Sequence, residues 1–175
     1  MDKVVWPRLE HGDELMTEKG KRHPDIIGKY GEYLVRYWLS RAGFEVVIVD
    51  YIGIDIIAYN PKTEQRLGIT VKSRLRIVGK EKEDVSLLKS PTDQDNLDYA
   101  CKIFLCIPCI GVYVETHSGG DLFLTSFEHY RNTYAGTRAE NKTVSWKMDT
   151  SHVKSYMNDR EISHIRFKFE LNPVD

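Results

Sequence analysis

A carboxylate and an ammonium group fall on two neighbouring segments that have the pattern of a β-hairpin. Segments 53–59 and 68–74 are rich in β-branched residues, and residues 60–64 between them have the composition of a tight connection. We therefore expect two adjacent antiparallel strands, with Asp55 on the first and Lys72 on the second.

Side chains alternate between the two faces of a strand, so the second strand separates its apolar residues from its polar ones. Asp55 on the neighbouring strand is expected to face the polar side. A carboxylate there can hold Mg²⁺, which prefers oxygen ligands, and a lysine beside it is a fixed positive charge for a phosphate. This combination suits hydrolysis of a phosphodiester. The polar face carries Gly68, Thr70, Lys72, Arg74 and Arg76, whereas Leu67, Ile69 and Val71 lie on the other face.

A helix over residues 28–42 is predicted upstream of the hairpin, because its apolar residues recur at helical spacing and Gly43 follows as a stop. Glu32 lies at the edge of the apolar face, where its carboxylate can reach over the sheet. The apolar positions are Leu34, Val35, Trp38, Leu39 and Ala42.

The order of these motifs resembles the PD-(D/E)XK nuclease superfamily, and within it small endonuclease domains and archaeal Holliday-junction resolvases. The resemblance covers about residues 19–131, although only residues 28–74 carry motifs. It implies an α/β, restriction-endonuclease-like fold with a three-layer core, in which helices flank a central mixed β-sheet. The motifs are a helix with Gly31-Glu32, a strand after Gly43-Phe44, Gly53-Ile54-Asp55, and a strand ending Val71-Lys72-Ser73.

The resemblance also implies Mg²⁺-dependent cleavage of a DNA backbone by water, with Mn²⁺ as a substitute metal. It implies that Asp55, Lys72 and Glu32 are catalytic, with Asp55 and Glu32 as metal ligands. Thr70 stands where the family has Glu or Gln, and we include it in the catalytic set. Because a neutral hydroxyl is a poorer ligand than a carboxylate, an acid on a helix would have to compensate. Glu32 is the first candidate, and Asp93 and Asp95 are alternatives.

Nucleic-acid contacts must come from local patches, because the formal net charge of the chain is −1. One patch surrounds the first helix and the other follows the second strand. The chain begins without an apolar leader and has no run near the roughly 20 apolar residues of a membrane helix. We therefore expect a cytoplasmic protein with DNA as its partner and no membrane, and related nucleases suggest a homodimer. The expected nucleic-acid-binding residues are Arg74, Arg76, Lys29 and Arg36.

Two other functions remain open at the level of sequence. The first is a nuclease-like fold that binds nucleic acid without cutting it, which the neutral Thr70 favours. The second is a protein-interaction module, for which four aromatic residues on the first helix would form the contact surface, although such a stripe is more often plain packing. These residues are Tyr30, Tyr33, Tyr37 and Trp38.

The chain of 175 residues, 41% of them hydrophobic, is expected to form a single domain spanning 1–175. Its nuclease-like core would span about 19–131, and a strand-helix-strand extension would span about 137–172. Residues 1–18 are expected to form an arm. The remaining predicted elements are a helix capped by Ser90, strands at 110–115 and 122–125, a short helix at 126–131, a charged turn at 79–84, a strand at 143–148, a helix after Thr150 and a strand at 162–170.

The three cysteines form an odd set, which fits a reducing compartment better than a disulfide framework. Cys106 and Cys109 have the spacing of a redox pair, but the flanking residues have the character of strand rather than helix. We expect buried apolar cysteines, with redox and zinc chemistry as the alternatives. Pro108 between them predicts an edge strand or a bulge.

Overall fold

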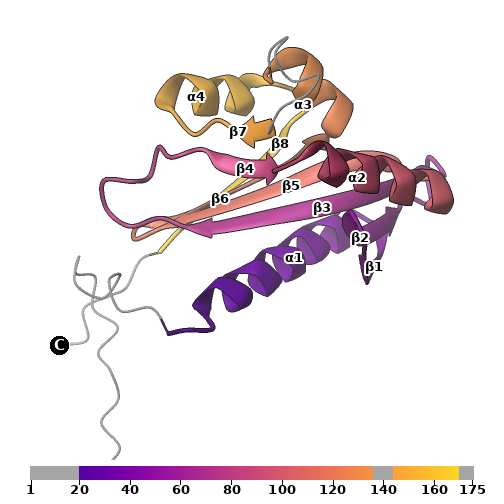
Figure 1. Cartoon of the computed structure of the whole chain (residues 1–175), viewed down its shortest axis with the longest axis horizontal. Helices are drawn as coiled ribbons and strands as arrows, with labels where there is room; N and C mark the ends of the chain where they lie inside the picture. The colour runs from indigo at the N-terminus through magenta and orange to yellow at the C-terminus, as the bar shows by residue number, and fades with distance from the viewer. Residues whose placement is uncertain (1–19, 136–143, 170–175) are drawn as a thin grey trace, which may run out of the picture.

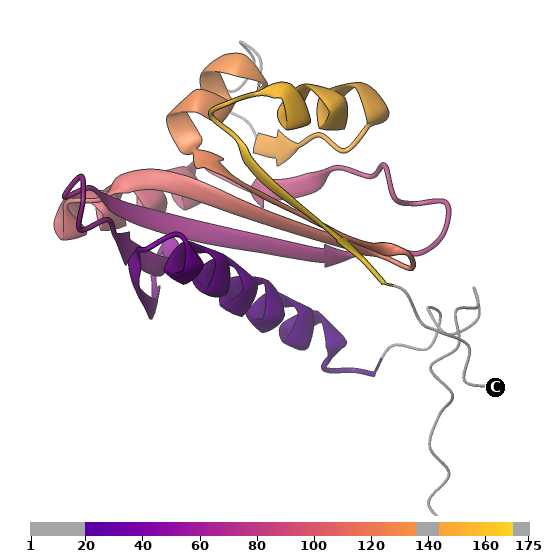
Figure 2. The ribbon, with the colours of Figure 1, turned by 180° about the vertical axis from the view of Figure 1, so that it is seen from behind.

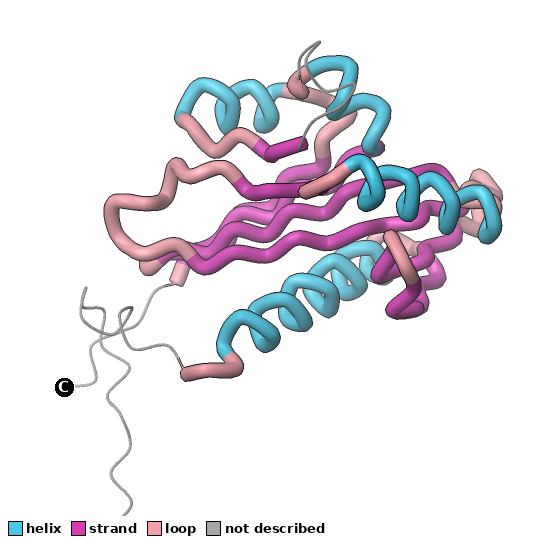
Figure 3. The backbone as a smooth tube through the Cα atoms, in the orientation of Figure 1, coloured by secondary structure: helices cyan, strands magenta, loops and turns pink. Residues whose placement is uncertain are grey.

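The computed structural model describes residues 20–135 and 144–169 (Figure 1). The predicted arm at 1–18 and parts of the extension, 137–143 and 170–172, lie outside these ranges. Figure 3 shows the described elements by type. In chain order they are α1 (His23–Arg41), β1 (Glu45–Tyr51), β2 (Ile54–Tyr59), β3 (Arg66–Leu75), β4 (Val85–Leu88), α2 (Pro91–Phe104), β5 (Ile107–Thr116), β6 (Gly119–Ser126), α3 (Phe127–Thr133), β7 (Val144–Trp146), α4 (Thr150–Asn158) and β8 (Ser163–Lys168).

The larger sheet has six strands in the order β1-β2-β3-β5-β6-β8. The pair β3 and β5 is parallel, because the chain crosses over through β4 and α2 between them, and the other neighbours are antiparallel. The sheet is therefore mixed, as predicted. The predicted hairpin is formed by β2 and β3, with Ile56 opposite Ile69.

Helices cover both faces of this sheet, as Figures 1 and 2 show from opposite sides. Helix α1 buries Val35 and Leu39 against Ile69 and Val71 of β3. Helices α2 and α3 lie on the other face and pack against the alternate residues of β5, including Val112. The predicted three-layer α/β arrangement, a central mixed sheet flanked by helices, is confirmed.

The C-terminal elements share a core with the rest of the chain. β7 pairs with β4 in a second sheet of two strands, and α4 packs beside it. Trp146 of β7 and Tyr156 of α4 are fully buried with Phe123 of β6 and Tyr130 of α3. β8 pairs with β6 along six residues, so the final strand extends the main sheet.

The structure differs from the sequence prediction at three places. α1 begins at His23 rather than residue 28, because Pro24 occupies the first turn, where a missing N–H costs nothing. β4 (Val85–Leu88) is a strand where no element was predicted. The prediction of an edge or bulge at Pro108 was wrong, since β5 lies between β3 and β6 with regular register. Its pairing with β6 begins only at Cys109, so Pro108 has a strand neighbour on the β3 side alone.

Candidate active site

A cavity of about 430 Å³ opens where β2, β3 and the N-terminal end of α2 meet. Four of the predicted site residues line it, and all come from the polar face of the hairpin. They converge because position 55 of β2 and the even-numbered positions of β3 face the same side of the sheet. The four are Asp55, Thr70, Lys72 and Arg74.

The Asp55 carboxylate is held in place by the backbone of the neighbouring strand. The pairing between β2 and β3 ends at Ile56 and Ile69. Beyond that point the backbone N–H of Val71 donates to Asp55 Oδ2 at 2.6 Å. A short bond to a backbone donor fixes the orientation of the carboxylate, and it does not use Oδ1. Asp55 therefore offers an oriented oxygen to a ligand in the cavity.

The opposite wall of the cavity comes from β4 and α2. Gly53 brings the turn before β2 against α2, because it adopts φ +83° and a Cβ there would overlap the backbone of Asn96. Asn96 lines the cavity. Of this wall, the sequence predicted only the start of α2, from the capping motif at Ser90, and Asp93 as an alternative acid for the site. The wall residues are Leu87, Leu88, Lys89, Asp93 and Asn96.

Asp93 lines the cavity, but its carboxylate already has a structural role. Its Oδ2 accepts hydrogen bonds from the backbone N–H groups of Lys89 at 2.7 Å and Ser90 at 3.1 Å. The Ser90 hydroxyl accepts from the Asp93 N–H, which completes the capping box of α2. Asp95, the other alternative acid, is exposed and lies outside the residues that line the cavity.

Glu32 on α1 is not among the residues that line the cavity. Its carboxylate pairs with Lys29 Nζ at 3.0 Å. The hydrogen bond to Glu32 is the main cause of a raised pKa of Lys29, and the negative charges of Asp50 and Asp55 add to it. The Lys29–Glu32 pair therefore lies within electrostatic reach of Asp55. The described residues contain no cluster of three or more His, Cys, Asp or Glu side chains arranged to share a metal ion.

The predicted nucleic-acid-binding residues divide into three groups. Arg74 lines the cavity, and its Nη1 donates to the Ser73 carbonyl at 2.7 Å. Arg76 lies outside it: Nη2 donates to the carbonyls of Glu83 at 2.8 Å and Asp84 at 2.7 Å. This side chain is only 11% exposed, so it anchors the loop before β4. Lys29 and Arg36 lie exposed on α1.

The three cysteines are free, and two of them are buried. Burial raises the pKa of Cys101 and of Cys109 to about 12, so their thiolate forms are scarce at neutral pH. Burial also raises the pKa of Cys106. Cys101 packs in the core on the α2 side of the sheet and Cys109 on the α1 side. This environment favours the interpretation of these residues as apolar core.

No protein-family model matches the sequence, and no curated protein matches it. Among solved structures, the chain is similar to Archaeoglobus fulgidus Hjc, a Holliday junction resolvase from an archaeal hyperthermophile. The two are 18% identical, the match covers 66% of this chain and 83% of that chain, and the TM-score is 0.47. None of the helices in the described ranges is both long enough and apolar enough to cross a bilayer.

Proposed function

We propose that this chain is a metal-dependent endonuclease that hydrolyses phosphodiester bonds in DNA. The observation that carries the proposal is the convergence of Asp55, Thr70, Lys72 and Arg74 in one open cavity. An oriented carboxylate, a hydroxyl and two cations on one surface suit a phosphate and a hydrated dication. The motif order of the sequence, which resembles nucleases of this type, supports the same reaction.

The donor set fits a dication that keeps most of its water. Mg²⁺ in proteins is commonly held by one or two carboxylates together with substrate phosphates, so it does not require a cage made by the protein alone. Asp55 would hold it, with the Val71 N–H fixing the carboxylate. Glu32, whose carboxylate is paired with Lys29, would be a second ligand. Mg²⁺ or Mn²⁺ at this site would activate a water molecule and neutralise charge on the phosphate.

The other side chains act on the substrate. Lys72 places a positive charge beside the scissile phosphate, where negative charge increases in the transition state. Arg74 binds a neighbouring backbone phosphate from the same wall. Thr70 lines the cavity although the residue is only 5% exposed, and its hydroxyl can donate a hydrogen bond to a phosphate oxygen or to water there. None of these contacts reads a base, so the site sets no sequence preference.

The decisive experiment measures metal binding and cleavage together. Mg²⁺ and Mn²⁺ are titrated calorimetrically into the wild type and into Asp55→Asn, and both proteins are assayed on duplex, branched and single-stranded DNA. Asn keeps an oxygen that can accept the Val71 N–H, so the fold should survive while metal binding and cleavage are lost. Cleavage by a folded Asp55→Asn protein at the wild-type rate would refute the proposal. Metal that binds only with substrate is detected by repeating the titration with uncleavable DNA.

A second candidate is a nucleic-acid-binding protein that does not cut. Two observations favour it: Thr70 offers a neutral ligand where a carboxylate would bind metal better, and Glu32 is paired with Lys29. This candidate predicts salt-sensitive DNA binding that does not change with Mg²⁺. Absence of cleavage on every substrate, together with such binding, would select it over the endonuclease.

We also propose DNA as the partner in the cytoplasm, with a homodimer as the form that cuts both strands of a duplex. Sedimentation of the protein alone and with a duplex tests the dimer. A monomer in both conditions, with cleavage of both strands intact, would contradict it.

A further inference from the structure

The exposed side of α1 carries a row of large side chains that the sheet does not cover. Ile26, Tyr30, Tyr33 and Tyr37 are 62%, 46%, 57% and 53% exposed. At about 100° per residue they fall within an arc of about 60° on the helix. We call these four residues the α1 tyrosine face. A contiguous row of this kind on a surface is a sign of a binding site, whereas scattered apolar residues are not.

Two of the rings are already held by neighbours. The Tyr30 ring packs edge-on against Tyr113, with centroids 5.5 Å apart. Tyr37 contacts Trp38 in the same manner at 5.4 Å, and its hydroxyl accepts a hydrogen bond from Arg41 at 3.3 Å. Rings that are half exposed yet fixed lose little conformational entropy when a ligand covers them.

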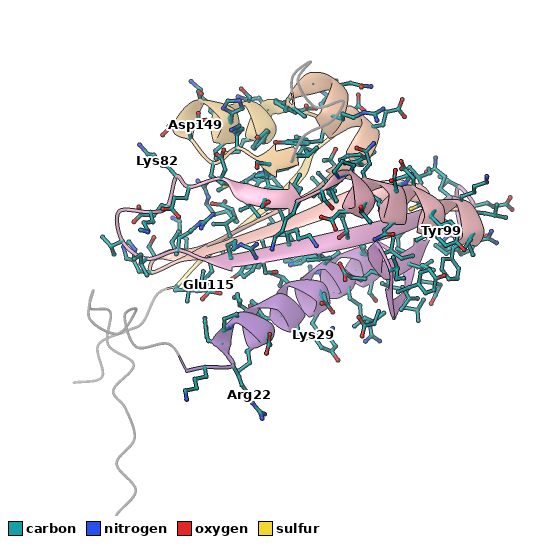
Figure 4. All side chains as sticks on the ribbon, viewed as in Figure 1. Arg22, Lys29, Lys82, Tyr99, Glu115 and Asp149 are labelled. Atoms are coloured by element: carbon teal, nitrogen blue, oxygen red, sulfur yellow. The ribbon has the colours of Figure 1, made fainter. Side chains whose placement is uncertain are left out.

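The charge around the α1 tyrosine face is positive. Helix α1 and the turn before it carry five Lys and Arg residues but only two acids, Asp25 and Glu32. By helical spacing, Lys29 and Arg36 border the row on one side and Arg41 on the other. Figure 4 shows Arg22 and Lys29 along this helix. The five cations are Lys21, Arg22, Lys29, Arg36 and Arg41.

The row and the cavity lie on opposite sides of the main sheet, because α1 packs on one face and α2 and β4 pack on the other. The Lys29–Glu32 pair borders the row, and Lys29 lies within electrostatic reach of Asp55. Tyr30 and Tyr37 are about 10 Å apart along the helix axis, enough for a short run of unpaired nucleotides. Aromatic rings interleaved with cations are what a single strand requires, because bases stack on the rings and phosphates pair with the cations.

We propose that the α1 tyrosine face binds unpaired nucleotides of the substrate, with Tyr33 and Tyr37 stacking on bases and the flanking cations contacting phosphates. The inference rests on the proposed function, because it names the substrate class of that site as DNA with a single-stranded portion. A stack of bases on rings is sequence-tolerant, since every base has a π-face.

The test is equilibrium binding of a fluorescent oligothymidylate and of a hairpin duplex, without divalent metal, to the full chain. Tyr33→Ala and Tyr37→Ala should each weaken binding of the oligothymidylate about 5- to 150-fold, and binding of the duplex less than about twofold. Tyr33→Phe and Tyr37→Phe should retain binding, because the ring remains. Raising the salt should weaken both complexes.

Tyr99→Ala is the matched control. Tyr99 is 57% exposed, as Tyr33 is, but it lies on α2 across the sheet from α1 (Figure 4). This variant should bind both probes as the wild type does. If an alanine variant fails to fold by circular dichroism, Tyr33→Leu and Tyr37→Leu replace it, and the same weakening is expected because leucine has no π-face.

Wild-type affinity of folded Tyr33 and Tyr37 variants for the oligothymidylate would overturn the inference. If those variants instead lower the sedimentation mass of the protein, the row is a protein interface. The outcome is independent of cleavage: tyrosine-dependent binding without any cleavage would leave this inference standing and remove the proposed endonuclease. If the protein cleaves single-stranded DNA and the tyrosine substitutions do not change its binding, the proposed endonuclease stands and this inference is overturned.

Discussion

At the scale of single residues, the chemistry depends on one oriented carboxylate and on the neutral residue that faces the same cavity. Asp55 is fixed by the Val71 N–H, and Thr70 lines the cavity beside it while only 5% exposed. A second carboxylate at position 70 would repel Asp55 in the absence of a cation and would share a dication with it. Position 70 is therefore the place where one substitution tests the metal site most directly.

Thr70→Glu should lower the melting temperature in the presence of a chelator, because a buried carboxylate beside another is costly. Mg²⁺ or Mn²⁺ should restore it, since a ligand at about 100 times its Kd adds about 2.7 kcal/mol to the free energy of unfolding. Thr70→Gln is the matched control with the same length and no charge, and its response to metal should be that of the wild type. Equal metal responses of the two variants would show that position 70 does not face a metal site.

Lys72→Met should slow cleavage by about 10²- to 10³-fold, the usual cost of removing one group that stabilises transition-state charge. Methionine keeps most of the length of the side chain, so metal binding and folding should be retained. The measurement is the single-turnover rate at saturating DNA. Lys102→Met, on an exposed position of α2 away from the cavity, should leave the rate unchanged. A similar loss in both variants would mean that the effect comes from net charge alone.

At the scale of elements, the position of α1 depends on a close approach to β3. A Cβ at Gly31 would overlap the Ser73 hydroxyl and lie 3.1 Å from Ser73 Cβ. Gly31→Ala should therefore lower the free energy of unfolding by about 1–3 kcal/mol, the range of overpacked cores. Gly28, in the same helix, has open space around its Cβ position, and Gly28→Ala should stabilise by up to about 1 kcal/mol. Denaturant unfolding measures both.

Adding Ser73→Ala to Gly31→Ala removes the hydroxyl and should recover part of the loss. A Gly31→Ala protein as stable as Gly28→Ala would show that α1 is not held this close to the sheet. The same contact explains the Gly31-Glu32 motif in physical terms, because the glycine lets the helix approach β3 and Glu32 follows at the edge of that contact.

The connection from α4 to β8 is held by Asp159. Burial raises the pKa of this carboxyl, but hydrogen bonds from the Glu161 N–H, His129 and Tyr134 outweigh it, so the pKa is below its usual value. A lowered folded-state pKa gives stability that is present above the unfolded value of about 4 and is lost as the pH falls through the folded value. Asp159→Asn should therefore cost about 1–3 kcal/mol at neutral pH and flatten the stability curve below about pH 4. The free energy of unfolding is measured by urea titration at a series of pH values. If its decrease at acid pH is the same in Asp159→Asn as in the wild type, the assigned role of Asp159 is contradicted.

The sequence predicted the elements whose signals are local. Period-two alternation located the hairpin and the convergence of Asp55 with Lys72, and the Ser90 motif located the start of α2. It did not reveal β4, whose four residues form a strand by pairing with β7, some 60 residues later in the chain. For the same reason it missed Asn96 as a wall of the cavity. The positions of Glu32 and Arg76 could not be predicted from the sequence either. Glu32 is held in an ion pair with Lys29 and Arg76 in a contact with the loop before β4, and the alternation pattern encodes neither contact.

At the scale of the whole molecule, the C-terminal elements support the candidate site. β7 pairs with β4, and Leu88 of β4 lines the cavity. Trp146 of β7 stacks on Tyr130 at 4.5 Å and packs against Tyr156 at 4.4 Å. These contacts join α3, α4 and the small sheet in one core. The predicted core and the predicted extension therefore share one set of buried aromatic rings. The prediction of a single domain can be tested by substituting one of these rings.

Trp146→Ala should lower the free energy of unfolding by about 3–5 kcal/mol, as for other buried aromatic residues. In a Trp6→Phe background, Trp38 is then the remaining tryptophan and reports from α1, on the opposite face of the sheet. If the chain is one cooperative unit, the Trp38 transition should shift by the same amount as the far-ultraviolet circular dichroism. Met157→Ala, at an exposed position of α4, should shift neither by more than about 0.5 kcal/mol. If the Trp38 transition stays in place while the circular dichroism shows two transitions, the C-terminal elements unfold separately. Cleavage should then be lost at the first transition, because β4 loses its partner strand.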